Sequence, residues 1–108
     1  MQDRNSVSRH LCSQLVSIVC AAGARIVPGN LEEIGRASAL VLADAPICSG
    51  ASVRITCGME QLRGIVKTCS FNKQLGFFVE VDLAPDSLWW PGWFTPQHLL
   101  ALFRSVAA

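Results

Sequence analysis

Charged residues are scarce in this 108-residue sequence, and their signs nearly cancel. They make up 16% of the chain, and the formal net charge is +1. Few charges together with 51% hydrophobic residues are typical of a folded domain and argue against disorder. A charge this close to zero gives no electrostatic footprint for DNA, RNA or an anionic membrane. We therefore expect no nucleic-acid polymer among the partners.

Long apolar runs are also missing, and we expect no secretory leader. Ser, Gly or a charged residue interrupts every apolar stretch well before the roughly 18 residues that a transmembrane helix needs. Residues 1–9 are polar and lack the apolar core of a signal peptide. The sequence therefore predicts no membrane insertion and a cytoplasmic location.

Residues that serve enzymes and metal centres are few and scattered. The two histidines, His10 and His98, lie near opposite ends of the chain, and no Gly-x-Ser-x-Gly or phosphate-cradling glycine motif occurs. The cysteines form no Cys-x-x-Cys pair of the kind that structural zinc sites use, and most lie in apolar runs. We expect no enzyme activity, no metal and no cofactor, and we interpret the cysteines as small hydrophobic residues: Cys12, Cys20, Cys48, Cys57 and Cys69.

Alternation of apolar and polar residues is the dominant pattern up to residue 83. It predicts strands over residues 14–20, 25–27, 31–34, 38–43, 53–57, 61–70 and 75–83. Turn signals separate several of them, at residues 28–30, 58–60 and 72–74. Short antiparallel strands at this spacing are typical of a barrel or sandwich, and a barrel leaves fewer exposed edges. We therefore predict an all-β fold, a small six-stranded antiparallel β-barrel over about residues 11–83.

The chain changes character after residue 83. Residues 84–94 form an aromatic linker with three tryptophans, Trp89, Trp90 and Trp93. Tryptophan is enriched at interface hot spots, so we expect one or two indoles to pack on the barrel and one to stay exposed for a partner. Thr95 as cap and Pro96 at the first position predict a C-terminal α-helix over about residues 95–106, which completes a single domain of residues 1–108.

A family resemblance rests on four stretches. Residues 33–41, Glu-Ile-Gly-Arg-Ala-Ser-Ala-Leu-Val, followed by residues 45–55, resemble the middle of a PilZ domain. Residues 62–67 and 76–83 are similar to two later strands of that family. The resemblance covers about residues 4–103. It implies a six-stranded barrel with a C-terminal helix, and a bacterial signalling role through the ligand cyclic di-GMP.

The same resemblance implies a nucleotide site. In the family, an Arg-x-x-x-Arg element grips phosphates and guanine edges, which suits the planar guanidinium fork. A second signature provides a small polar cluster for the other guanine. Carried over to matching positions, the candidate cyclic di-GMP site consists of Arg4, Arg9, Glu33, Gly35, Arg36 and Ser38.

Two functions stay open at this point. The chain is either a cyclic di-GMP-responsive signalling module or a degenerate PilZ-like domain that no longer binds nucleotide and acts as a protein-interaction adaptor. Arg4 and Arg9 are five positions apart rather than four, and Gly35 replaces a hydroxyl-bearing residue. These departures motivate the adaptor hypothesis, in which the partner contacts come from Trp89, Trp90 and Trp93.

Overall fold

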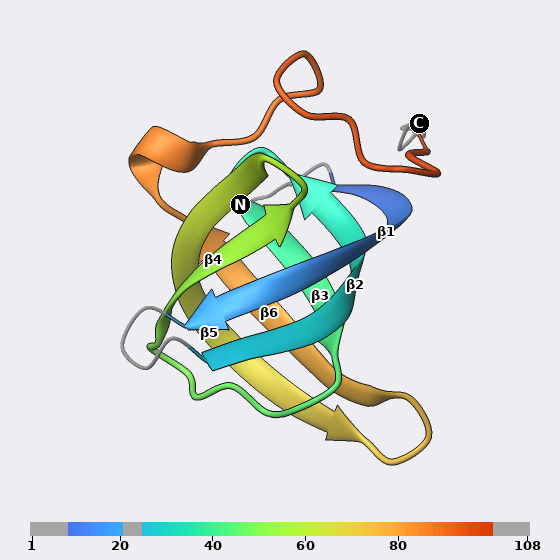
Figure 1. Cartoon of the computed structure of the whole chain (residues 1–108), viewed down its shortest axis with the longest axis vertical. Helices are drawn as coiled ribbons and strands as arrows, with labels where there is room; N and C mark the ends of the chain where they lie inside the picture. The colour runs from blue at the N-terminus through green and yellow to red at the C-terminus, as the bar shows by residue number, and fades with distance from the viewer. Residues whose placement is uncertain (1–8, 21–24, 101–108) are drawn as a thin grey trace, which may run out of the picture.

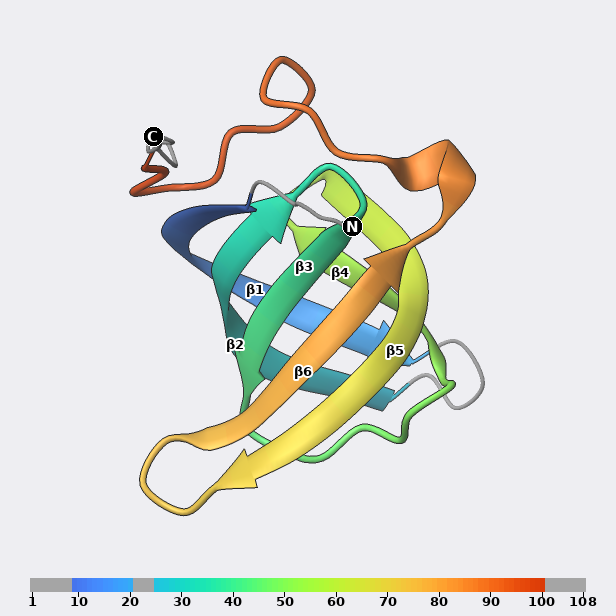
Figure 2. The same ribbon diagram turned by 180° about the vertical axis from the view of Figure 1, so that it is seen from behind.

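A computed structural model describes residues 9–20 and 25–100 of the chain. This part forms six antiparallel strands that close into a barrel in the order β1-β2-β3-β6-β5-β4 (Figures 1 and 2). The all-β barrel that the alternation predicted is therefore confirmed. The elements are β1 (Arg9–Cys20), β2 (Arg25–Gly35), β3 (Ser38–Ala43), β4 (Ser52–Cys57), β5 (Glu60–Asn72), β6 (Gly76–Leu83) and a 3-10 turn, η2 (Pro85–Ser87).

Alternating side chains of all six strands fill the barrel. On β6, Val79 and Val81 are fully buried and Leu83 nearly so, whereas Asp82 between them is exposed. Gly64 on β5 lets two strands approach closely, because a Cβ there would collide with the backbone carbonyl of Asp82. The largest fully buried strand side chains are Ile18, Leu31, Ile34, Val41, Val66, Val79 and Val81.

One predicted turn is wrong. Residues 28–30 continue β2 instead of reversing the chain, so the predicted pieces 25–27 and 31–34 are parts of one strand. Pro28 faces Ser17 of β1, and its carbonyl accepts a hydrogen bond from Asp44 N–H at 3.0 Å. Pairing with both neighbouring strands therefore overrides the local turn preference of Pro-Gly-Asn. The turns between β4 and β5 and between β5 and β6 occur where the sequence predicted them.

The predicted C-terminal helix is also wrong over the residues that can be compared. Residues 95–100 are not helical, and residues 101–106 lie outside the described part. The reason is the edge of β1, which pairs with β4 only through its last residues, from Ser17 to Cys20. Its free first half is bonded instead by the C-terminal segment: Ser13 N–H donates to Gln97 O at 3.0 Å, and Leu100 N–H donates to Leu11 O at 2.7 Å.

Residues 84–100, which we call the strap, cross one end of the barrel. The loop between β5 and β6 projects from the opposite end (Figures 1 and 2). Within the strap, Pro96 is fully buried, and Phe94 and Leu99 pack against the barrel core. No helix within residues 9–20 and 25–100 is long and apolar enough to cross a membrane. The strap-covered end holds the tryptophans and the candidate nucleotide residues that the structure describes, so it is the region of interest for function.

Candidate binding surface at the strap-covered end

Backbone hydrogen bonds fix the strap to strand ends on several sides of the barrel. Ala84 N–H donates to Arg63 O of β5 at 2.8 Å, and Trp89 N–H donates to Arg36 O of the β2–β3 turn at 2.8 Å. The buried Ser87 hydroxyl accepts a hydrogen bond from Arg63 N–H at 2.9 Å. With the two bonds to β1, these contacts define the course of the strap across the barrel end without regular secondary structure.

The three tryptophans have three different environments. Trp89 is 3% exposed, packs edge-on to the His10 ring at 5.7 Å, and donates its Nε1–H to Phe94 O at 2.7 Å. Trp93 is half-buried against the core, and Trp90 is 60% exposed. The expectation that the indoles would divide between core and surface is confirmed, and Trp90 is the exposed one.

The exposed Trp90 ring has a defined position on the strap. It lies against Gly92, where an added Cβ would collide with three atoms of the six-membered ring. Trp93 N–H also donates to Trp90 O at 3.0 Å, which closes the backbone around this glycine. The absence of a side chain at residue 92 therefore sets where the indole can lie.

An open hollow of about 520 Å³ lies beside Trp90. Among the described residues its lining contains one guanidinium, that of the exposed Arg36, and no carboxylate. Within the described part of the chain, the Arg36 side chain makes no ion pair or hydrogen bond. The hollow thus combines a cation with an aromatic and apolar wall, and its lining residues are His10, Arg36, Leu88, Trp89, Trp90 and Pro91.

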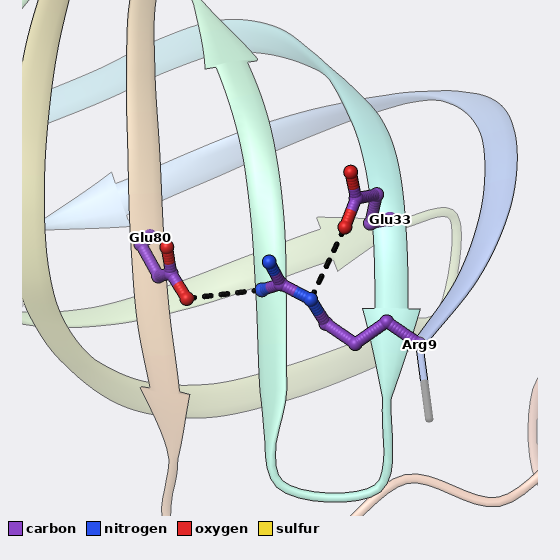
Figure 3. Close-up of polar contacts among 3 residues, drawn as sticks. All are labelled: Arg9, Glu33 and Glu80. Carbon is purple, nitrogen blue, oxygen red and sulfur yellow. Dashed lines mark hydrogen bonds and ion pairs between the residues drawn. The ribbon is translucent and has the colours of Figure 1, made fainter. Parts of the chain in front are cut away.

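Arg9 lies on the outer face of the barrel and bridges two carboxylates (Figure 3). Its Nε lies 3.1 Å from Glu33 Oε1 on β2, and its Nη1 lies 3.0 Å from Glu80 Oε2 on β6. Leu40 of β3 pairs with both acidic residues, so the Arg9 guanidinium connects β2 and β6 across β3. The three side chains are 26%, 30% and 31% exposed, and we call this group the Arg9 clasp.

The structure brings together most of the predicted nucleotide residues. Arg9 pairs with Gly35 in the β1–β2 ladder, Arg36 occupies the following turn, and Ser38 begins β3 opposite Asp82. Arg4 lies outside the described residues. Sequence reasoning missed Glu80, because its carboxylate reaches Arg9 only through the barrel register.

Cys12 and Asp86 are the described groups with clearly shifted pKa values. Partial burial, reinforced by the charges of Glu32 and Glu33, raises the pKa of the Cys12 thiol to about 11. A hydrogen bond from Arg63 lowers the pKa of Asp86, whose Oδ1 lies 2.8 Å from Arg63 Nη2. A thiol held neutral is a poor nucleophile and metal ligand. Within the described ranges no three His, Cys, Asp or Glu side chains gather as a metal site.

Comparison with known proteins identifies no relative of this chain. No protein-family model, no curated protein and no solved structure matches this chain. Functional inference therefore rests on the residues and geometry of the strap-covered end.

Proposed function

We propose that this chain is a PilZ-like, non-catalytic binding module that acts as a protein-interaction adaptor through the surface around Trp90. The observation that carries the proposal is a tryptophan that is 60% exposed and yet seated against Gly92 beside an open hollow. A large ring that is already oriented loses little conformational freedom on binding, which is what interface anchors require.

The Arg9 clasp argues against nucleotide binding as the main function. A phosphate that used Arg9 would displace Glu33 and Glu80, and both carboxylates would then face the incoming anion without their cation. Asp82, opposite Ser38, adds a third negative charge to the same corner. Like charges brought together in this way oppose binding, because each carboxylate favours a cation over a phosphate.

Cyclic di-GMP remains a second candidate because of one observation. Arg9, Glu33, Gly35, Arg36 and Ser38 gather at one corner of the barrel, as the family resemblance implies. If the clasp is what opposes the ligand, the Glu33→Gln/Glu80→Gln variant should bind cyclic di-GMP more tightly than the wild type. An unchanged absence of binding in that variant would remove this candidate.

The adaptor proposal is tested by comparing two equally exposed apolar side chains. Trp90 and Leu75 are both 60% exposed, but Leu75 lies in the loop between β5 and β6 at the other end of the barrel. We expect Trp90→Ala to lose a partner captured from host-cell extract and Leu75→Ala to keep it. The purified partner should then bind the wild type at least tenfold more tightly than Trp90→Ala in a calorimetric titration.

Two results would contradict the proposal. One is a captured set that is identical for the wild type and Trp90→Ala, with both proteins folded by far-ultraviolet circular dichroism. The other is a partner lost equally in Trp90→Ala and Leu75→Ala, because that pattern indicates general apolar adhesion rather than a surface at the strap.

A further inference from the structure

We infer that the hollow beside Trp90 takes an acidic peptide segment of the partner protein. An aspartate or glutamate side chain of that segment pairs with Arg36, and an adjacent apolar side chain packs on Trp90. This inference rests on the proposed adaptor function and names the chemistry that the surface recognises.

Charge complementarity selects the polar half of this ligand. Arg36 is exposed and makes no ion pair within the described part of the chain, and the described lining of the hollow includes no Asp or Glu. The nearby carboxylates of Glu33 and Glu80 are engaged by Arg9. Neither these carboxylates nor that of Asp82 at the same corner line the hollow. A guanidinium with open donors matches a carboxylate in a bidentate manner, whereas a basic segment would meet a like charge.

The apolar half of the ligand follows from the remaining lining. Trp90 and Pro91 are exposed, Leu88 is half-buried, and the buried Trp89 lies beneath them. This small apolar area accommodates one side chain of leucine size rather than a broad interface. Such a contact is weak in isolation, so the guanidinium and the indole should contribute most of the affinity as neighbouring anchors.

Binding at this site should also depend on Gly92, because this glycine determines where the Trp90 indole can lie. Since a Cβ at residue 92 would occupy the space of the Trp90 ring, Gly92→Ala must move the ring while leaving it in the chain. A site that needs only an exposed aromatic group anywhere on the strap would tolerate this change. A site that needs the ring beside Arg36 would not tolerate it.

The experiment uses two matched probes and the isotope-labelled full chain. The probes are the peptides acetyl-Leu-Glu-Leu-Glu-Leu-amide and acetyl-Leu-Gln-Leu-Gln-Leu-amide, which differ in charge but hardly in shape. Two-dimensional NMR follows the indole N–H signals of the tryptophans during each titration. We expect the acidic peptide to shift the Trp90 signal with an affinity at least about tenfold above that of the neutral peptide, because charge-assisted hydrogen bonds are roughly twice as strong as neutral ones.

Arg36→Gln is the decisive variant, and Arg54→Gln is its control. Arg54 is an exposed arginine of β4 that lies outside the lining of the hollow. Arg36→Gln should reduce binding of the acidic peptide to the level of the neutral one, and Arg54→Gln should leave it unchanged. Gly92→Ala should also weaken binding, with the barrel signals of the spectrum preserved.

The outcomes separate this inference from the proposed function. Equal shifts with both peptides, or equal losses in Arg36→Gln and Arg54→Gln, would overturn the acidic recognition while leaving Trp90 as an adaptor surface. No shift with either peptide, alongside a captured partner that still depends on Trp90, would overturn it as well. Loss of that dependence on Trp90 would instead contradict the adaptor function itself.

Discussion

The barrel and the strap are held together in different ways. The barrel combines continuous strand ladders with a core of fully buried aliphatic side chains. The strap has no ladder of its own beyond its bonds to β1, and single contacts such as that of the Ser87 hydroxyl hold it in place. Strand pairing along the whole length of each element holds the barrel, whereas separate hydrogen bonds and the burial of Trp89 and Pro96 hold the strap. The exposed Trp90 lies on the strap, outside the strand ladders.

The largest expected effect is on the barrel. Ile34→Ala removes a fully buried side chain of β2 and should lower the free energy of unfolding by about 2–5 kcal/mol. Leu15→Ala, at a β1 position that is 77% exposed, should change it by less than about 0.5 kcal/mol. Urea unfolding of the two variants measures both values. Similar destabilisation by both substitutions would contradict the core that the structure defines.

A single hydroxyl of the strap should have the next largest effect. Ser87→Ala removes the acceptor of the Arg63 backbone N–H in a partly buried hydrogen bond, which should cost about 0.5–1.5 kcal/mol of unfolding free energy. Ser70→Ala, at an exposed β5 position, is the matched control and should be nearly neutral. If the two substitutions prove equally mild in thermal unfolding, this contact does not hold the strap.

Thiol reactivity should distinguish the barrel wall from the loop between β3 and β4. Because burial raises the pKa of Cys12 to about 11, its thiolate is scarce at neutral pH, and alkylation by iodoacetamide should be slow. The exposed Cys48 should react first. Mass spectrometry of partially alkylated protein gives the order of labelling. Labelling of Cys12 before Cys48 would show that β1 opens readily in solution.

Cys12 also predicts how stability responds to alkaline pH. Its pKa is raised in the folded state from an ordinary value of 9.0, so the unfolded chain loses this proton first. Stability should therefore fall as the pH rises from about 9 to about 11. Cys12→Ser should flatten that part of the profile of melting temperature against pH. A wild-type profile with the same slope as the variant would count against the burial of this thiol.

The smallest effect should come from the ion pair between Arg63 and Asp86. Its exposed geometry makes it a weak contributor that salt screens. Because the folded-state pKa of Asp86 is lowered below 3.8, the stabilisation is present above that value and disappears as the pH falls through the folded-state pKa. Melting temperatures of the wild type and Asp86→Asn should thus differ slightly at neutral pH and converge in acid. A difference that persists in acid would have another origin.

Local pattern was sufficient to predict the barrel and insufficient to predict the strap. Alternation predicted the strand that became β6, because burial on one face, here of Val79, Val81 and Leu83, leaves a period of two in the sequence. The Thr-Pro helix start failed because the free edge of β1 offers backbone partners to residues 97 and 100. Such a partner is remote in the sequence and leaves no local signal.

The candidate site was also predictable from the sequence only in part. The sequence indicated that one of three neighbouring indoles would be exposed, since they cannot all point inward, but only the collision at Gly92 identifies the seat of Trp90. Arg9 and Glu33 were both candidates for the nucleotide site. The contacts of Arg9 with both Glu33 and Glu80 depend on the register that places Glu33, Leu40 and Glu80 side by side across three strands. Register of this kind follows from tertiary pairing rather than from local sequence.

A calorimetric titration of cyclic di-GMP into the full wild-type chain tests the central claim most directly. We propose that the Arg9 guanidinium, which this nucleotide would need, stays paired with Glu33 and Glu80, and that the module binds a protein at Trp90 instead. We therefore expect no measurable heat at high micromolar protein concentration. Micromolar binding of cyclic di-GMP would contradict this expectation if Arg9→Ala abolishes the binding and Trp90→Ala leaves it unchanged.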